Sequence, residues 1–376
     1  MRKIILGVSV AILLGIVAAV LILGKAAHQT LPSTNLLLTK FEDPELQPTA
    51  TANERIRLAD NIIEQLISLY PDDAAVYDIR ADRLNLSSDI VAVEANWLKA
   101  LSLEPKFSDA LFGLAEIANS RGEYEKAISY CEAIPRNYGA YARVVLLLAD
   151  SLMENGQAQR AALTLQRHLA EDHASVQALL LLGTIHLNSG ELEEAIVAFS
   201  KVLEFAPDSK GAYYGLTQAH ARLGNKELAQ EFKRLHASAK PLNAEGGSTG
   251  DSYSVETLAR VYADSALIHQ RHGELAKAQE YLLRALYLQP NDIKWLTDLQ
   301  RVLVLRGLQP EAIEVGERLA RLTPNDVDVL LNLGELYAEV ERFDQSIAVY
   351  ERAIEVAPHD IRCKKARAVI RQMDLH

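Results

Sequence analysis

The chain has 376 residues, of which 49% are hydrophobic and 24% are charged, and its formal net charge is −11. This composition is typical of a globular protein and excludes a largely disordered chain. The excess of acidic residues argues against a nucleic-acid backbone as partner, because proteins that bind one usually present a basic face.

The first feature along the chain is an uncharged apolar stretch, Ile4–Leu23. It has the length of a helix that crosses a bilayer at about 1.5 Å per residue. The apolar core of a cleavable signal peptide is shorter, roughly 7–15 residues. We therefore predict that residues 1–23 form a cytoplasmic tip and a transmembrane signal-anchor, which binds the membrane through residues 4–23.

The charges on either side of this stretch predict its orientation. Arg2 and Lys3 precede it and only Lys25 follows closely, which favours a cytoplasmic N terminus. The protein would then be a single-pass protein of the inner (cytoplasmic) membrane of a bacterial cell, with the rest of the chain on the extracytoplasmic side. A second interpretation stays open, secretion after cleavage near Ala26, because small residues flank Lys25. Residues 24–50 are rich in Pro, Ser and Thr and are predicted to be a linker.

Beyond the linker, three kinds of marker residue recur with a period of 34, except for one interval of 49 between Gly224 and Gly273. A glycine marks the turn within each unit, where a left-handed backbone favours a residue without a side chain. A proline closes most units, because it cannot continue a helix, whereas Gly139 and His173 stand at its position in the second and third units. A small residue stands where two helices cross. The glycines are Gly122, Gly156, Gly190, Gly224, Gly273 and Gly307, with Glu341 at the next position; the prolines are Pro105, Pro207, Pro241, Pro290, Pro324 and Pro358; the alanines are Ala127, Ala161, Ala195, Ala229, Ala278 and Ala312.

The segment Val176–Ser209 carries all three markers, together with a Leu-Gly pair and Phe199. It resembles the tetratricopeptide repeat, a helix–turn–helix unit of 34 residues. The resemblance implies an all-α fold, a right-handed superhelical solenoid of about eight such units with capping helices at its ends. The units are expected to begin near Ala74, Ser108, Ala142, Val176, Lys210, Ala259, Ile293 and Val327.

This frame divides the chain into segments. Residues 51–73 are predicted to form an N-terminal capping helix and residues 74–243 to form units one to five. Residues 244–258 are expected to be a flexible insertion, residues 259–360 to form units six to eight, and residues 361–376 to form a C-terminal capping helix. The insertion is either tolerated at an inter-repeat turn or serves as a hinge between five units and three.

No residue pattern in the chain predicts catalysis. His186, His220 and His269 recur at one position of three consecutive units, but equivalent residues of stacked helices lie about 8–10 Å apart. Metal bonds of about 2 Å cannot join them, so we interpret them as packing residues with a polar end. His168 stands where a small core residue is usual and predicts imperfect packing. Cys131 and Cys363 lie several repeats apart and are predicted to be free thiols. We expect no catalytic residue, no cofactor, no metal site and no small-molecule substrate.

The family resemblance also implies where a partner would bind. The first helices of such units line a concave groove that holds an extended peptide or a partner's helix. The leucines of this groove either face the partner or pack inward. Both interpretations stay open, because the position of a residue within its helix is predicted only to within roughly one or two residues. Candidate groove residues are Asp82, Glu116, Leu146, Leu147, Asp150, Leu180, Leu181, Leu187, Tyr214 and Arg301.

The function expected from these features is that of a membrane-anchored scaffold or adaptor. It would bind partner proteins or peptides in its concave groove, in envelope assembly or secretion. The alternative is a cytoplasm-facing regulatory subunit of an enzyme complex.

Overall fold

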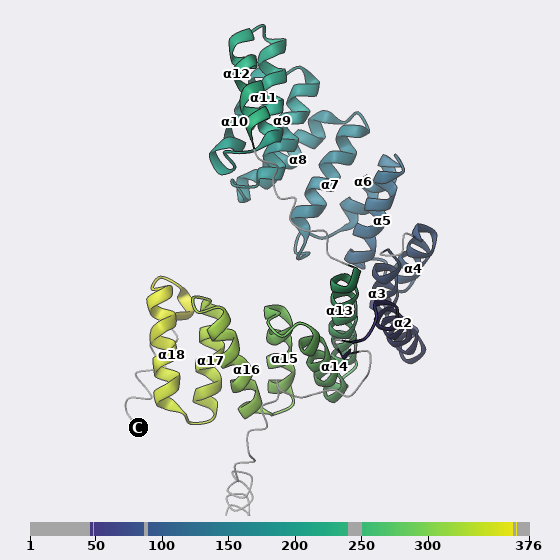
Figure 1. The fold of residues 1–376 in the computed structure, drawn as a ribbon, viewed down its shortest axis with the longest axis vertical. Helices are drawn as coiled ribbons and strands as arrows, with labels where there is room; N and C mark the ends of the chain where they lie inside the picture. Colours follow the sequence, from purple (N-terminus) through teal and green to yellow (C-terminus); the bar gives the residue numbers. More distant parts are fainter. Residues whose placement is uncertain (1–45, 48, 86–88, 240–249, 364–365, 367–376) are drawn as a thin grey trace, which may run out of the picture. The chain divides into compact units, whose positions relative to one another are not determined.

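The computed structural model describes residues 46–47, 49–85, 89–239, 250–363 and 366, and in these ranges it contains helices and turns but no strand (Figure 1). The prediction of an all-helical fold is thus confirmed. The predicted signal-anchor and nearly all of the predicted linker lie outside the described residues. None of the described helices is both long and apolar enough to span a membrane.

Among the described residues, helix α2 (Ala52–Leu69) comes first, and eight helix pairs follow it. The pairs are α3 (Ala74–Asn85) and α4 (Ile90–Leu103), α5 (Ser108–Ser120) and α6 (Tyr124–Ala133), α7 (Tyr141–Glu154) and α8 (Ala158–Glu171), α9 (Val176–Ser189) and α10 (Leu192–Phe205), α11 (Lys210–Arg222) and α12 (Lys226–Ser238), α13 (Gly250–Arg271) and α14 (Leu275–Leu288), α15 (Ile293–Leu305) and α16 (Gln309–Leu322), and α17 (Val327–Glu339) and α18 (Phe343–Val356).

The helix starts follow the predicted repeat phase. Helices α3, α5, α9, α11, α15 and α17 begin at the residues predicted for their units, and α7 begins one residue earlier, at Tyr141. Helix α13 begins at Gly250, inside the segment that the sequence assigned to an insertion. Of the predicted C-terminal helix, only residues 361–363 and 366 are described, and they are helical.

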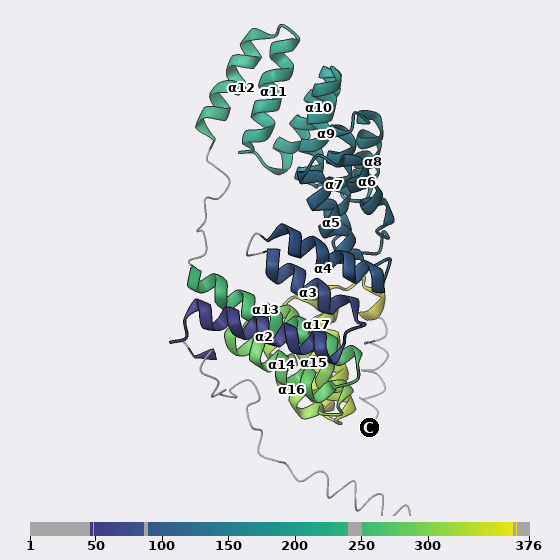
Figure 2. The ribbon, with the colours of Figure 1, turned by 90° about the vertical axis from the view of Figure 1, so that its right-hand side faces the viewer.

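The chain forms two compact units. The N-terminal unit comprises Thr51–Ile268, and the C-terminal unit comprises His269–His376 with the residues up to Ala50. The division therefore falls within α13 and not in the 244–258 segment. Within the N-terminal unit, α3 to α12 pack in chain order, and Figure 2 shows α12 beside α11 at the end of this run.

The turns explain why glycine recurs. Gly190 ends α9 with a φ of 81°, in the left-handed region where a side chain is disfavoured. Its turn is closed by the amide of Glu191, which donates to the carbonyl of His186 at 2.9 Å. Glu341 occupies the same turn after α17 and keeps the left-handed geometry, with a φ of 61°. The turn is therefore imposed by the repeat even where glycine is missing.

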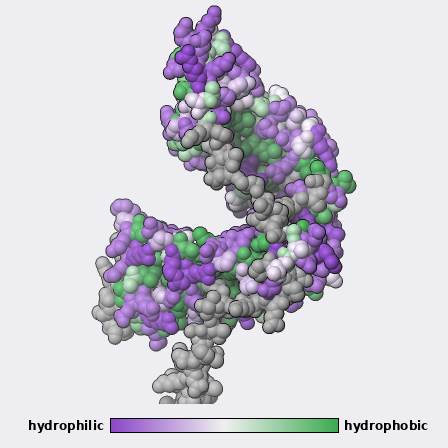
Figure 3. Space-filling model, in the orientation of Figure 1, coloured by the Kyte–Doolittle hydropathy of each residue, from purple (hydrophilic) through white to green (hydrophobic). Residues whose placement is uncertain are grey.

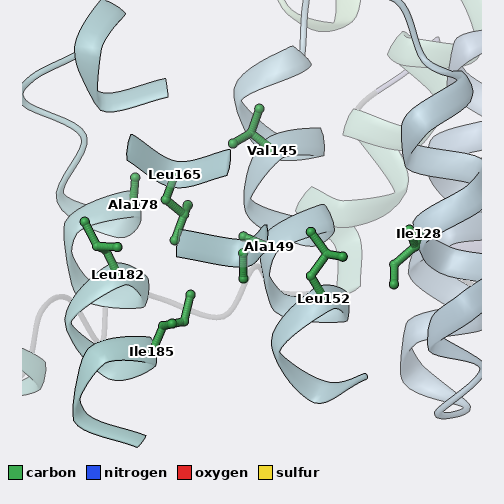
Figure 4. Close-up of a cluster of buried hydrophobic side chains, with 9 residues drawn as sticks. Ile128, Val145, Ala149, Leu152, Leu165, Ala178, Leu182 and Ile185 are labelled. Carbon is green, nitrogen blue, oxygen red and sulfur yellow. The ribbon is translucent and has the colours of Figure 1, made fainter. Parts of the chain in front are cut away.

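The core runs between successive helices. Ala161 and Ala195 are fully buried where the helices of a pair cross. Figure 4 shows Leu165 of α8 between the side chains of α7 and those of α9, so that this second helix fills the gap between two first helices. Ala229 of α12 departs from this pattern, because α12 buries none of its residues. Cys131 and Cys363 are both buried thiols, and the Cys363 thiol donates a hydrogen bond to the carbonyl of Ala353.

Candidate functional site

The surface formed by the first helices α5, α7 and α9 contains an open hollow of about 380 Å³, which we call the first-helix hollow. Five candidate groove residues come together there. Figure 3 shows apolar residues gathered on the hollowed side of the N-terminal unit. The lining residues are Phe112, Glu116, Arg143, Leu146, Leu147, Asp150, Gln177 and Leu181.

The leucines of this hollow have two roles. Leu146 and Leu181 are half-buried and pack against the cluster that contains Leu165, while their remaining surface faces the hollow. Leu147 does the same against a neighbouring cluster. Both interpretations left open by the sequence therefore apply to the same side chains. An apolar floor that stays accessible is characteristic of protein interaction sites.

Two other leucines do not belong to the hollow. Leu187 is 5% exposed and packs with Phe199 in the core, so its assignment to the groove was wrong. Leu180 is half-buried and lies on the same core cluster, with its Cδ2 atom 3.2 Å from the position that a β-carbon on Gly211 would take. The helical period places these residues on α9, but the neighbouring helices decide which side chain is covered.

Polar groups stand around the apolar floor. The Arg143 guanidinium pairs with the Glu116 carboxylate at 3.3 Å and lies 4.7 Å from the centre of the Phe112 ring. Asp150 accepts a hydrogen bond of 3.0 Å from the Asn119 side chain. Burial raises the pKa of Glu116, and Arg143 partly offsets this effect. The hollow thus combines leucine surface with two carboxylates and one cation.

Further carboxylates crowd on α3 and at the start of α5. Asp78 accepts a hydrogen bond of 2.8 Å from the Trp97 indole, and Asp109 accepts one of 2.5 Å from the Tyr138 hydroxyl. Burial raises the pKa of Asp78 to about 8, and repulsion by Asp82 and Asp109 adds to the shift. A nearby cation would favour the ionised form of such a carboxylate and would lower its pKa.

Three further candidates also lie outside the first-helix hollow. Asp82 lines a smaller hollow of about 80 Å³ between α3 and α13, where burial raises its pKa and Arg260 opposes the shift. Tyr214 is 58% exposed, and its ring centre is 6.0 Å from that of His236. Arg301 belongs to the C-terminal unit and pairs with Asp298 at 3.0 Å.

The three recurring histidines bind the turn of their own repeat. His186 contacts Glu191, His220 lies 3.3 Å from the Asn225 side chain, and His269 lies 3.0 Å from Glu274. Each partner follows its histidine by five residues and precedes the second helix. Within the described ranges, no group of three His, Cys, Asp or Glu residues is arranged to hold a metal ion.

The surface formed by the second helices carries two hollows that the repeat pattern did not predict. One, of about 490 Å³, lies between α8 and α10, and the other, of about 310 Å³, lies between α6 and α8. Helix α8 buries only Ala161 and Leu165, which leaves space on both of its sides. The signal in the sequence was His168, which occupies a position where a small core residue is usual.

Four family profiles, each described as Tetratricopeptide repeat, match residues 96–129, 146–210, 259–292 and 310–370. Each matched segment overlaps the helical repeats of the structure. The chain is a tetratricopeptide-repeat protein.

Curated relatives of this tetratricopeptide-repeat protein include two human proteins. It is 23% identical over 231 residues to Protein O-mannosyl-transferase TMTC1, and the aligned residues make up 60% of this chain and 24% of that protein. It is 25% identical over 188 residues to Anaphase-promoting complex subunit 7, and the aligned residues make up 50% of this chain and 30% of that protein. The chain thus spans less than a third of the length of these relatives.

Solved structures with the same kind of repeat are also similar. The P58(IPK) TPR domain shares 15% identity with a TM-score of 0.28 and covers 86% of this chain and 98% of its own. A tetratricopeptide repeat protein from Parabacteroides merdae shares 12% identity with this chain, with a TM-score of 0.33. The match covers 69% of this chain and 96% of that protein.

Proposed function

We propose that this tetratricopeptide-repeat protein is a non-catalytic scaffold or adaptor that holds a segment of a partner protein on its first-helix hollow. The observation that carries the proposal is the convergence of Leu146, Leu147 and Leu181 with Glu116 and Asp150 in one accessible hollow. One relative is named as a subunit of a complex, which agrees with a role in assembly.

The chemistry of the surface defines the segment that it would bind. The leucine floor takes apolar side chains from the middle of a peptide. The carboxylates of Glu116 and Asp150 beside this floor attract lysine or arginine at one end of the peptide, because opposite charges on two binding surfaces are complementary. The ligand is therefore an extended or helical peptide with an apolar centre and a basic end.

We further propose that residues 4–23 anchor the protein in the inner membrane of a bacterial cell, with the repeats on the extracytoplasmic side, in envelope assembly or secretion. The uncharged apolar stretch and the basic residues before it support this location. Secretion after cleavage near Ala26 and a cytoplasm-facing regulatory subunit are the alternatives. Alkaline phosphatase fused after His376 is active only if the repeats are exported, whereas a fluorescent protein that matures only in the cytoplasm reports the opposite orientation.

Peptide binding can be tested with the full chain in detergent. The probe is a fluorescein-labelled peptide with two leucines between lysines, and its counterpart has glutamate in place of lysine. We expect the lysine peptide to bind and the glutamate peptide to bind at least about tenfold more weakly, as the loss of a charged contact predicts.

Two variants locate the binding. Leu181→Asp puts a charge on the floor of the hollow and should abolish binding. Leu228→Asp changes a leucine of α12 that is 41% exposed, and should bind as the unaltered chain does. Equal binding of both peptides, or full binding by Leu181→Asp with an unchanged melting temperature, would overturn the proposed site.

A further inference from the structure

The hollow between α6 and α8 differs in chemistry from the first-helix hollow. Its lining includes Arg136, Arg160, Arg167 and His168, opposed by Glu132 and Glu171, in a chain whose net charge is −11. We call it the arginine hollow. Its volume of about 310 Å³ holds a few side chains. An excess of cations in an acidic protein points to an anionic ligand.

The arginines are not equally engaged. Arg160 is held by Glu132, with 2.7 Å between the guanidinium and the carboxylate, and also bonds Gln157. By contrast, no hydrogen bond or ion pair joins Arg136 or Arg167 to another residue of the described ranges. The two free guanidiniums come from different elements, the α6–α7 connection and α8. Their shared hollow is therefore a product of the fold.

A third polar group in this hollow is unsatisfied. The Nε2 atom of His168 is buried and has no hydrogen-bond partner among the described residues. A buried polar nitrogen without a partner destabilises the unbound protein, because the nitrogen has lost its hydrogen bonds to water. A ligand that brings an acceptor or a donor to His168 removes this destabilisation. This observation is independent of the arginines and points to the same hollow.

The remaining lining is apolar. Tyr141, Val145 and Leu148 of α7 line the hollow, and Leu163 of α8 is 52% exposed beside it. A small anion such as phosphate would satisfy the guanidiniums but leave this surface in water. A protein segment covers both parts, because it carries a carboxylate and an apolar side chain as neighbours.

We propose that the arginine hollow binds an acidic segment of a partner protein. A glutamate or aspartate carboxylate of that segment lies between Arg136 and Arg167, and an adjacent apolar side chain packs on Leu163. Guanidinium groups hold a carboxylate through two parallel hydrogen bonds, which selects it over an amide. The site lies on the second-helix surface, and it prefers a ligand of opposite charge to that of the first-helix hollow. Binding here does not depend on the proposed function.

The test uses the full chain in detergent and a short fluorescein-labelled peptide in which aspartates alternate with leucines. Its counterpart has asparagine in place of aspartate. We expect the aspartate peptide to bind with an affinity that falls as salt rises, and the asparagine peptide to bind at least about tenfold more weakly. Equal affinity for the two peptides, or no binding of the aspartate peptide, overturns the proposal.

Variants separate this site from the rest of the surface. The double variant Arg136→Gln and Arg167→Gln should lose at least about tenfold in affinity, since it removes the charged contacts. Leu163→Ser should weaken binding by a smaller factor. Arg234→Gln on the exposed surface of α12 is the matched control and should bind normally.

Circular dichroism of each variant checks that the fold is kept, and the exposed positions of Arg136 and Arg167 predict that it is. Unchanged affinity in the double variant overturns the proposal. So does displacement of the peptide by inorganic phosphate that equals the displacement by an unlabelled aspartate peptide, because the apolar contacts would then contribute nothing.

Discussion

The ring of Phe199 lies against the backbone of Gly215: a β-carbon on Gly215 would stand 2.3 Å from the Cε2 atom of Phe199. The same ring lies 2.7 Å from the corresponding position on Gly183. One aromatic side chain of α10 thus fills the space left by two glycines, in the first helix of its own repeat and in that of the next. Trp97 packs on Gly113 in the same way.

This contact predicts a large effect for a small substitution. Gly215→Ala should lower the free energy of unfolding by about 1–3 kcal/mol, because Phe199 is 2% exposed and has little space to move. Urea denaturation followed by circular dichroism measures the change. Gly139→Ala is the control, since nothing lies within 4 Å of its added carbon. Similar midpoints for the two variants would contradict the packing described here.

Glu341→Gly should stabilise the C-terminal unit. Glu341 holds a φ of 61°, and a left-handed backbone costs a residue with a β-carbon about 1–2 kcal/mol. The greater freedom of glycine in the unfolded chain offsets part of this gain, so the expected net increase is about 0.5 kcal/mol. A rise in the midpoint of thermal unfolding supports the prediction. The matched change Glu339→Gly, at the end of α17, should lower the midpoint, and a common direction for both variants would count against it.

Ala195→Trp should destabilise the protein more than Ala158→Trp. Ala195 is fully buried where α9 and α10 cross, and an indole there forces the helices apart at a cost of about 1–3 kcal/mol or more. Ala158 is half-buried at the start of α8 and has solvent on one side. Comparison of the two urea midpoints is the measurement. Equal losses would mean that the crossing positions are assigned wrongly.

Asp78 should make stability depend on pH. Its pKa is raised to about 8 in the folded protein from an ordinary value of 3.8, so the folded state retains a proton that the unfolded state loses. Below about pH 4 both states are protonated, and Asp78 leaves the free energy of unfolding unchanged. As the pH rises from there toward 8, the free energy of unfolding falls by at most about 1.4 kcal/mol per pH unit.

Asp78→Asn isolates this contribution, because the amide oxygen still accepts the hydrogen bond from Trp97. Thermal midpoints of both proteins between pH 4 and pH 8 should diverge, with the asparagine variant less sensitive to pH. Parallel curves for the two proteins would show that Asp78 ionises normally.

Local marker residues in the sequence were sufficient to predict where the repeats begin and turn. The glycine and alanine positions predicted the turns and the helix crossings because each repeat packs only on its neighbours, so that local pattern and local contact coincide. Even Glu341, which breaks the glycine series, adopts the expected turn, since the adjoining helices impose it. The structure of Ile4–Leu23 lies outside the described residues, and the membrane anchor stays a prediction.

The binding surfaces were only partly predictable. Five candidates converge in the first-helix hollow, but Leu187, on the same helix as Leu181, is covered by core side chains. A helical period gives the direction of a side chain only to within part of a turn, and the neighbouring helix decides whether it is buried.

The arginine hollow illustrates the limit of the pattern more clearly. Arg136 and Arg167 have no repeat spacing that relates them, and they come from a connection and a helix. They meet because α8 packs loosely and leaves a gap beside α6. The 34-residue pattern is sufficient to stack helices, since the stacking uses the positions that recur. Residues that occur once along the chain are brought together by the packing of the helices, and that packing is a property of the tertiary structure.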